Sequence, residues 1–271
     1  MNENNQVKEI ERSIVKKFRK PIWSKFIRAI KDYQLIEEND KIAVCISGGK
    51  DSMLLAKLLE ELKKHGKINF DIEYIIMNPG YTEEHITQIK NNLSILNINA
   101  HIFETPIFQI ADKTENPCYM CAKMRRGYLY DEAKQLGCNK IALGHHFNDV
   151  VETILLNLIF NGSYSSMMPK LHSDHFENMQ LIRPMYYIKE EDIIAWSKYN
   201  NLTFIDCACS VTQKNSGKRQ VVKELVRELK KINEDADRSI LKSTSNVNLD
   251  TIIAYKQKGT LTHFLENYDK K

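Results

Sequence analysis

Residues 41–52 read Lys-Ile-Ala-Val-Cys-Ile-Ser-Gly-Gly-Lys-Asp-Ser, and this stretch decides the fold. Its first half is mainly apolar and predicts a buried strand, and the Leu-rich segment 53–62 that follows has helical spacing. Gly48 and Gly49 let the chain turn without a Cβ clash, so that successive backbone N–H groups can converge on one anion where the helix begins. The stretch therefore predicts a phosphate-binding loop between a strand and a helix.

The charged residues of this loop indicate a nucleotide chemistry other than that of a Walker A motif. A Walker A motif separates its first Gly from the Gly-Lys pair by four residues, whereas Gly48 and Gly49 are adjacent. Lys50 would bring a mobile positive charge to phosphate oxygens, and Asp51 is the natural carboxylate for a Mg²⁺ ion that bridges them. A plain Gly-Gly turn is the simpler alternative, but the flanking strand and amphipathic helix favour a nucleotide site.

Apolar segments of strand length alternate with longer segments of helical spacing through the middle of the chain. This order predicts an α/β fold, a Rossmann-like parallel twisted sheet with helices on both faces. We expect strands at 41–46, 71–77, 100–104 and 140–143, and helices at 51–64, 82–96, 120–136 and 148–160. Ligands of such sheets collect at the carboxyl ends of the strands, where the Ser-Gly-Gly loop, Asn78-Pro-Gly80 and Gly144-His-His146 all fall.

The length and composition predict one sizeable core with flanking segments. The chain has 271 residues, of which 42% are hydrophobic, and nothing indicates two full domains. We expect a helical N-terminal segment at 1–37, the core at 38–210 and a mainly helical C-terminal segment at 211–271. A further short strand is predicted at 202–205.

The charge pattern suits a soluble protein with a polyanionic partner. No apolar run is long enough to span a bilayer, and residues 1–20 are of mixed charge, unlike a signal sequence, so we expect a cytoplasmic protein with no membrane partner. The formal net charge is +4, and basic residues cluster in 16–31 and 214–231. These clusters would suit a nucleic acid, although solvated helix faces would give the same pattern.

The six cysteines are too few and too unevenly spread for a disulfide scaffold. Cys45 and Cys138 lie in or beside predicted strands and are most simply small buried residues. Cys118 and Cys121 lie two residues apart at the start of a helix, a spacing that lets both bind one metal centre. Cys207 and Cys209 form a second pair.

Several of these segments together resemble known families. The Ser-Gly-Gly-Lys-Asp-Ser loop resembles that of the PP-loop ATP pyrophosphatases. Pro-Cys-Tyr-Met-Cys-Ala-Lys-Met-Arg-Arg-Gly-Tyr-Leu-Tyr at 117–130 and Lys-Ile-Ala-Leu-Gly-His-His-Phe-Asn-Asp at 140–149 resemble the tRNA 2-thiocytidine synthetase family. The likeness continues through Met-Pro-Lys-Leu at 168–171, Ile-Arg-Pro at 182–184 and Arg-Gln-Val at 219–221, so it covers most of residues 25–230.

This resemblance implies an activity and its cofactors. Such enzymes use ATP and Mg²⁺ to adenylate the C2 oxygen of a cytidine in tRNA, cytidine 32, and replace it with sulfur to give 2-thiocytidine. They carry an oxygen-sensitive iron-sulfur cluster, which we expect to be [4Fe-4S]. The implied partners are tRNA and a sulfur donor, either sulfide or the persulfide of a cysteine desulfurase. Members can pair as homodimers, for which the flanks 1–37 and 211–271 are the expected contact.

The resemblance also implies site residues. The catalytic residues would be Lys50, Asp51, Cys118 and Cys121. The cluster would be held by Cys118, Cys121 and Cys207, with Cys209 as the alternative third ligand because Asp206-Cys-Ala-Cys209 is one residue shorter than the corresponding family segment. ATP would be contacted by Ser47, Gly48, Gly49, Lys50, Asp51, Ser52, Met77, Asn78, Gly144 and His145, and we expect His146 to line the adenosine pocket as well.

Three other functions are compatible with the sequence. A cluster-free PP-loop ligase of the lysidine synthetase type would transfer an amine to an adenylated base, which the four clustered cysteines argue against. A zinc-containing thiolase would use the same thiolates for Zn²⁺ and carry sulfur as a persulfide. A non-enzymatic regulator would bind ATP without releasing pyrophosphate.

Overall fold

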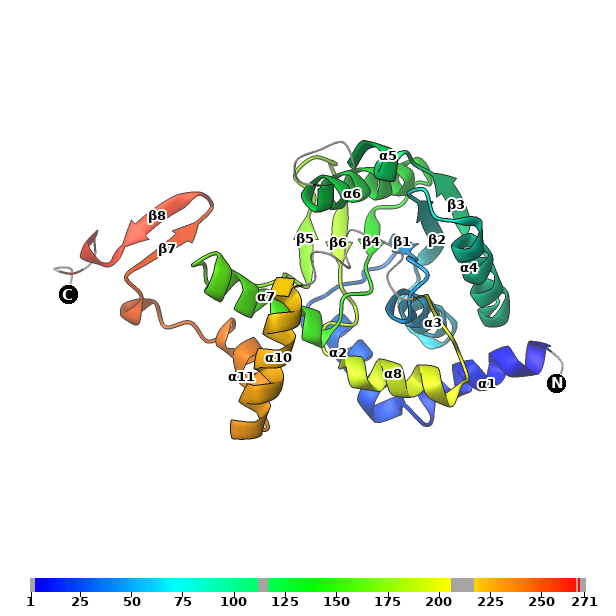
Figure 1. The fold of residues 1–271 in the computed structure, drawn as a ribbon, viewed down its shortest axis with the longest axis horizontal. Coiled ribbons are helices and arrows are strands. Elements are labelled where there is room, and N and C mark those ends of the chain that lie inside the picture. Colours follow the sequence, from blue (N-terminus) through cyan, green and yellow to red (C-terminus); the bar gives the residue numbers. More distant parts are fainter. Residues whose placement is uncertain (1–2, 112–116, 206–216, 267, 269–271) are drawn as a thin grey trace.

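The structure is a computed structural model, and it describes residues 3–111, 117–205, 217–266 and 268. At its centre lies a sheet whose strands run in the order β3-β2-β1-β4-β6-β5 (Figure 1). The strands are β1 (Lys41–Cys45), β2 (Asp71–Asn78), β3 (His101–Glu104), β4 (Lys140–Ala142), β5 (Lys170–His172) and β6 (Gln180–Ile182). All neighbours pair in parallel except β5, which runs antiparallel to β6 at one edge. The mostly parallel sheet confirms the predicted fold class.

Helices cover both faces of this sheet, as predicted. They are α1 (Glu3–Val15), the π-helical turn η1 (Arg19–Trp23), α2 (Ser24–Asp32), α3 (Lys50–His65), α4 (Glu83–Leu96), α5 (Ile107–Ala111), α6 (Pro117–Gln135), α7 (Phe147–Phe160), α8 (Glu190–Tyr199), α10 (Gly217–Ile232) and α11 (Ala236–Ser243). In Figure 1, α6 lies on one side of the sheet, and α1, α2, α3 and α8 lie on the other.

Strand β1 shows how the sequence divides the two layers. Alternate side chains of a strand point to opposite faces, and β1 is apolar on both. Ile42 and Val44 belong to the large core that includes α3, α4, α8 and the N-terminal helices, whereas Ala43 and Cys45 pack in a second core with Tyr130 of α6. Cys45 and Cys138 are both buried in that second core, as expected for small apolar residues.

The N-terminal helices are part of the main core. Ile10, Ile14 and Phe18 are buried together with Ile22 and Phe26 in the cluster that contains the β1 side chains. Within the described residues, the helical content predicted for 1–37 is confirmed. The burial of these side chains shows that the segment is packed against the sheet layer.

Outside the C-terminal segment, four short segments were predicted wrongly. Strands β5 and β6 and the short helix α5 were not predicted, because β5 and β6 contain only three residues each, too few for a periodicity to register. The predicted strand at 202–205 is not a strand. Its apolar side chains are buried or half-buried, but its backbone lies beside helix α8 and the phosphate loop, and it pairs with no strand that the structure describes.

The C-terminal segment is helical only in its first part. After α10 and α11 the chain forms the 3-10 turn η2 (Leu249–Thr251), the hairpin β7 (Ala254–Gln257) and β8 (Thr260–His263), and the turn η3 (Phe264–Glu266). Lys258 and Gly259 both have positive φ, at 50° and 85°, as a two-residue hairpin turn requires. This Lys-Gly pair was the sequence signal for the hairpin, which projects away from the sheet (Figure 1).

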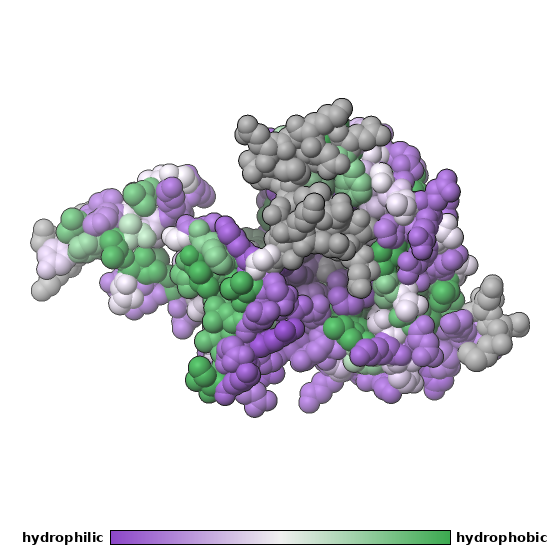
Figure 2. Space-filling model, viewed as in Figure 1, coloured by the Kyte–Doolittle hydropathy of each residue, from purple (hydrophilic) through white to green (hydrophobic). Residues whose placement is uncertain are grey.

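Apolar side chains are exposed along that projecting hairpin and near it (Figure 2). They include Ile253, Leu261, Phe264, Leu265 and Tyr268. Among the helices that the structure describes, we find none with both the length and the apolar character that a membrane span requires.

Candidate active site

The loop after β1 is closed by hydrogen bonds within a few residues of chain. The backbone N–H of Ser47 donates to Oγ of Ser52 at 3.1 Å, and the Oγ atoms of the two serines lie 3.2 Å apart. Ser52 Oγ also donates to the carbonyl of Gly49 at 3.0 Å. Ser52 is buried, so its hydroxyl fixes the shape of the loop from below. These hydrogen bonds fix the backbone of the loop between β1 and α3.

Two glycines are required by the close packing around this loop. Gly48 has a φ of +87°, and a Cβ there would lie 2.7 Å from Cγ1 of Ile89. Gly144 follows β4, and a Cβ there would lie 3.0 Å from the backbone nitrogen of Ser52. Gly48 therefore lies tightly against α4, and Gly144 lies tightly against the backbone at the start of α3, so a side chain at either position would force its neighbours to shift.

Lys50 and Asp51 begin α3 and face each other. Lys50 Nζ lies 3.3 Å from Oδ2 of Asp51 and 3.4 Å from Oε1 of Glu190. Burial opposes the charge of Lys50, but the two carboxylates outweigh it, and the pKa of Lys50 lies above its ordinary value. Burial raises the pKa of Asp51. Its Oδ1 is buried without a hydrogen-bond partner in the described structure, which suits an oxygen that awaits a cation.

The two histidines after β4 have different roles. His146 is the N-cap of α7, where its side chain accepts a hydrogen bond from the backbone of Asp149 while the Asp149 side chain accepts one from the backbone of His146. His146 therefore caps a helix and does not line the cavity, contrary to our expectation. His145 does line a cavity, and burial lowers its pKa to about 4, so its ring is neutral at neutral pH.

A first cavity, which we call the β4 cavity, lies at the carboxyl ends of β1, β2 and β4. It has a volume of about 440 Å³, within the range of small-molecule sites. Its apolar wall comes from strand residues and α6, and its polar wall from the phosphate loop. The lining residues are Cys45, Ile46, Ser47, Asp51, Ser52, Met77, Tyr81, Arg125, Arg126, Leu129, Ile141, Leu143, Gly144, His145 and Asp149.

A second cavity, which we call the α8 cavity, lies on the other side of the phosphate loop. It has a volume of about 600 Å³ and is lined by Ser47, Gly49, Lys50, Asp51, Tyr81, Arg125, Ile194, Ser197, Lys198, Leu202, Thr203, Phe204 and Ile205. Ser47, Asp51, Tyr81 and Arg125 line both cavities. The two spaces therefore meet at the phosphate loop.

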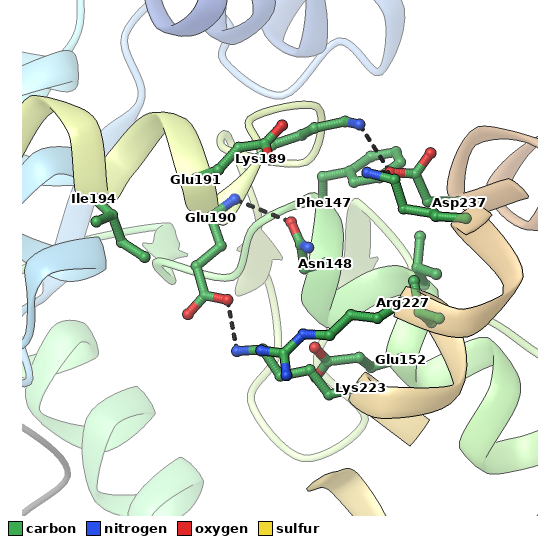
Figure 3. Close-up of a pocket in the computed structure, with 13 residues that line it drawn as sticks. Phe147, Asn148, Glu152, Lys189, Glu190, Glu191, Ile194, Lys223, Arg227 and Asp237 are labelled. Carbon is green, nitrogen blue, oxygen red and sulfur yellow. Dashed lines mark hydrogen bonds and ion pairs between the residues drawn. The ribbon is translucent and has the colours of Figure 1, made fainter. Parts of the chain in front are cut away.

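Helix α10 holds this region from the outside through ion pairs (Figure 3). Glu190 Oε2 accepts from Lys223 of α10 at 2.6 Å, and the backbone N–H of Glu190 donates to Oδ1 of Asn148 at 3.0 Å. Arg219 donates to Asp149 at 2.6 Å and to Glu152 at 2.8 Å. Since Glu190 also contacts Lys50, α10 is connected to the phosphate loop through one carboxylate.

The end of β2 supplies one residue to the cavity and one to a turn. Met77 lines the β4 cavity. The Oδ1 of Asn78 accepts from the backbone of Gly80 and Tyr81, and its Nδ2 donates to Glu104 at 2.9 Å. Asn78 shapes the turn that carries Tyr81 to both cavities.

Comparison with known proteins identifies the relatives of this arrangement. The family model of the PP-loop domain matches residues 19–229. The tRNA-cytidine(32) 2-sulfurtransferase of Geotalea uraniireducens is 40% identical over 224 residues, which cover 81% of this chain and 88% of that protein. The chain belongs to the PP-loop tRNA-cytidine(32) 2-sulfurtransferase family. The enzyme of the same name from Geobacter metallireducens is 38% identical over 81% of this chain and 87% of its own length.

A solved structure of related fold agrees with this family membership. The U34-tRNA thiolase NcsA from Methanococcus maripaludis, whose structure includes its [4Fe-4S] cluster, has a TM-score of 0.66 at 23% identity. The match covers 84% of this chain and 78% of that one. At this identity the likeness establishes the fold.

For a member of this family, the placement of the cysteines is of special interest. Cys118 and Cys121 both lie in the first turns of α6; the side chain of Cys121 is half-buried, and that of Cys118 lies outside the described side chains. Arg125, one turn further along α6, lines both cavities, so Cys121 lies on the helix face that points toward them. Cys207 and Cys209 lie outside the described residues.

Four residues near the loop were missed or undervalued in the sequence. Tyr81 carries no motif, and Glu190 lies far along the chain from Lys50, so only the fold brings them together. Arg125 and Arg219 had weak signals: the first stood one turn after the cysteines, and the second lay in the family-like segment 219–221. None of them could be placed without the topology.

Proposed function

We propose that this protein is an ATP-dependent tRNA thiolase that converts a cytidine, cytidine 32, to 2-thiocytidine. One observation carries the proposal: a hydrogen-bonded loop lies beside Asp51, whose buried Oδ1 accepts no hydrogen bond among the described residues and lies 3.9 Å from Nε2 of His146. The loop fits a pyrophosphate group, and the orphaned carboxylate oxygen fits the Mg²⁺ ion that would bridge it.

The first step would be adenylation of the base. The cytidine O2 attacks the α-phosphorus of ATP, pyrophosphate leaves, and the oxygen becomes part of a phosphate ester. Lys50 and the loop amides other than that of Ser47, which donates to Oγ of Ser52, would stabilise the charge of the departing pyrophosphate. His145 and Gly144 would approach the adenosine, with Met77 on the apolar wall of the β4 cavity. The neutral ring of His145 adds no positive charge there.

The second step would be displacement by sulfur. Sulfide attacks C2, and AMP leaves with the original oxygen, so no electron donor is needed. Thiolates are the ligands that iron-sulfur clusters require, and two cysteines in the first turns of one helix fit such a centre. Bound by Cys118, Cys121 and either Cys207 or Cys209, a [4Fe-4S] cluster would supply one iron with an open coordination position that can hold sulfide.

The proposal extends to partners and organisation. The sulfur donor would be sulfide, or the persulfide of a cysteine desulfurase together with a thiol that forms a disulfide with the desulfurase cysteine as the outer sulfur leaves as sulfide. The tRNA would be met in the cytoplasm. Residues 38–210 would form the catalytic core between the flanks 1–37 and 211–271. The exposed apolar residues of the β7–β8 hairpin make the C-terminal flank a contact surface for a homodimer.

Nucleoside analysis of tRNA tests this function directly. We expect tRNA from a strain lacking the gene to lose 2-thiocytidine, and air-protected protein to restore it with ATP, Mg²⁺ and sulfide. Iron and acid-labile sulfide should be present in that protein. A colourless protein that restores thiolation with bound zinc would favour the zinc thiolase, and a protein that joins an amine to the base would favour the cluster-free ligase. ATP binding with no pyrophosphate release under any of these conditions would favour a regulator.

A further inference from the structure

We propose that the α8 cavity receives the target pyrimidine of the RNA, turned out of its strand, and that the RNA backbone crosses the rim of this cavity at Lys198. This inference rests on the proposed function, which names a cytidine but not the surface that takes it. The ligand is a flipped pyrimidine nucleotide of a single-stranded loop.

The position of the cavity relative to the phosphate loop is the first argument. The β4 cavity has the apolar strand ends and Gly144 that an adenosine would need. The α8 cavity begins at the opposite side of the same loop, where Gly49 and Lys50 form its wall. A base placed there would meet the α-phosphate at the junction formed by Ser47 and Asp51, which line both spaces.

The second argument is an unpaired length of backbone on the cavity wall. Within the described residues, the backbone groups of Thr203, Phe204 and Ile205 make no hydrogen bond. Phe204 and Ile205 are half-buried, and half-buried backbone groups normally find a partner. The edge of a pyrimidine offers both donors and acceptors. Phe204 is itself supported by stacking on buried Trp196, with ring centroids 6.4 Å apart and planes at 13°, so this wall is rigid.

The third argument is the charge of the rim. Lys198 lines the cavity and is exposed, with no ion pair among the residues that the structure describes. Beside it, Lys17 Nζ lies 3.7 Å from the ring centroid of exposed Tyr199. Exposed basic residues with an aromatic ring are the groups that hold an RNA backbone and stack its bases.

The groove between α8 and α10 is a less suitable place for RNA. Its lysines are already paired: Lys223 with Glu190 at 2.6 Å, and Lys189 and Lys230 with Asp237 at 2.8 and 3.4 Å. Figure 3 shows the first of these pairs inside the groove. Carboxylates there would repel a phosphate, whereas Asp51 is the one carboxylate that lines the α8 cavity, and Lys198 on its wall has no ion pair among the described residues.

Fluorescence of an anticodon stem-loop RNA with pyrrolo-cytidine at position 32 tests the pocket. This base fluoresces more strongly when it is unstacked, so binding to the full-length wild-type protein should raise its emission. Thr203→Trp would fill the cavity from an exposed position, and we expect it to abolish the emission change while RNA anisotropy and ATP affinity stay within about twofold. Thr203→Ser is the matched variant that should keep the change.

Salt titration tests the rim with a matched pair of lysines. Lys198 and Lys242 are exposed and lie in the last turns of α8 and α11. Lys198→Ala should lower the slope of log affinity against log salt by about 1, the loss of one phosphate contact, and Lys242→Ala should leave it unchanged. Equal slopes for the two variants would contradict the proposal that the RNA backbone crosses the cavity rim at Lys198.

The outcomes separate this inference from the proposed function. If Thr203→Trp keeps the full emission change, or if it thiolates tRNA as fast as the wild type, the base does not enter the α8 cavity, although the function stands. If the wild type unstacks the base and Thr203→Trp does not, the pocket stands even where no 2-thiocytidine forms.

Discussion

The phosphate loop and the ion-pair network around it are held by opposite means. The loop is closed by Ser47, Gly49 and Ser52, which lie within six residues of one another and hydrogen-bond among themselves. The amine of Lys50, by contrast, contacts Glu190, and Glu190 contacts Lys223, so its surroundings come from residues 140 and more positions away. The backbone of the site is thus local, whereas the position of its mobile charge depends on the whole fold.

This difference predicts which substitutions abolish nucleotide binding and catalysis and which mainly lower stability. Changes to the loop should remove nucleotide binding directly, since its amides and Asp51 are the groups that would touch phosphate and metal. Changes to the network should alter stability and the position of Lys50, but they leave the loop intact.

The largest effect is expected from Asp51→Ala compared with Cys121→Ala. Loss of the Asp51 carboxylate should lower tRNA-dependent pyrophosphate release by about 10²-fold or more and leave the visible absorbance of the brown protein unchanged. Cys121→Ala should remove that absorbance and the thiolation but retain ATP binding. Absorption spectra and pyrophosphate assays on both variants check this, and loss of both properties in both variants would contradict two separable sites.

A second prediction concerns the close approach at Gly48. Gly48→Ala should lower the free energy of unfolding by about 2 to 4 kcal/mol, because the added Cβ meets Ile89 and the left-handed backbone disfavours alanine. Gly137→Ala is the control: its φ of +74° is similar, but nothing lies within 4 Å of the added Cβ. Urea denaturation should show a cost near 1 kcal/mol there, and equal costs at the two sites would exclude the contact with Ile89.

A third prediction concerns pH. The pKa of His145 is about 4 in the folded protein against 6.5 ordinarily, so the unfolded chain binds the proton more strongly. Stability should therefore fall as the pH decreases through 6.5 and be lost by up to about 3 kcal/mol near pH 4. The raised pKa of Asp51 acts in the opposite sense. Urea denaturation of His145→Asn and wild type across this range isolates the histidine, and identical pH profiles would contradict its buried neutral state.

The smallest effect is expected in the network itself. Arg219→Ala removes the partner of Asp149 and of the largely buried Glu152, and because Arg219 is half exposed the cost should be about 1 to 2 kcal/mol. Arg238→Ala breaks an exposed pair with Asp235 and should cost less than about 0.5 kcal/mol. Thermal unfolding of the two variants compares them; an Arg219 variant as stable as the Arg238 variant would show that α10 does not hold α7.

The same contrast explains how much could be predicted from the sequence. The strand, the Gly-Gly turn and the helix of residues 41–62 are adjacent in the chain, so their pattern predicted the loop and the parallel sheet. Glu190 and Tyr81 reach the site only through tertiary packing, which no local pattern encodes. His146 was misjudged because a capping residue and a ligand-binding residue look alike until the start of α7 is known.

The prediction of the short elements failed for a different reason. Strands β5 and β6 are three residues each, so their burial comes from neighbours and not from their own periodicity. The segment 202–205 has the apolar content of a strand, but it lies against α8 and the phosphate loop. There the backbone groups of 203–205, which make no hydrogen bond to the described residues, form part of the wall of the α8 cavity.

The most direct measurement of the central claim is the stoichiometry of the reaction under anaerobic conditions. Air-protected protein, tRNA lacking 2-thiocytidine, sulfide and ATP labelled in the α-phosphate are combined, and AMP, pyrophosphate and the thionucleoside are counted. The account predicts one AMP and one pyrophosphate for each 2-thiocytidine, with all three lowered by about 10²-fold or more in Asp51→Ala. Thiolation without ATP cleavage, or cleavage to ADP and phosphate, would contradict it.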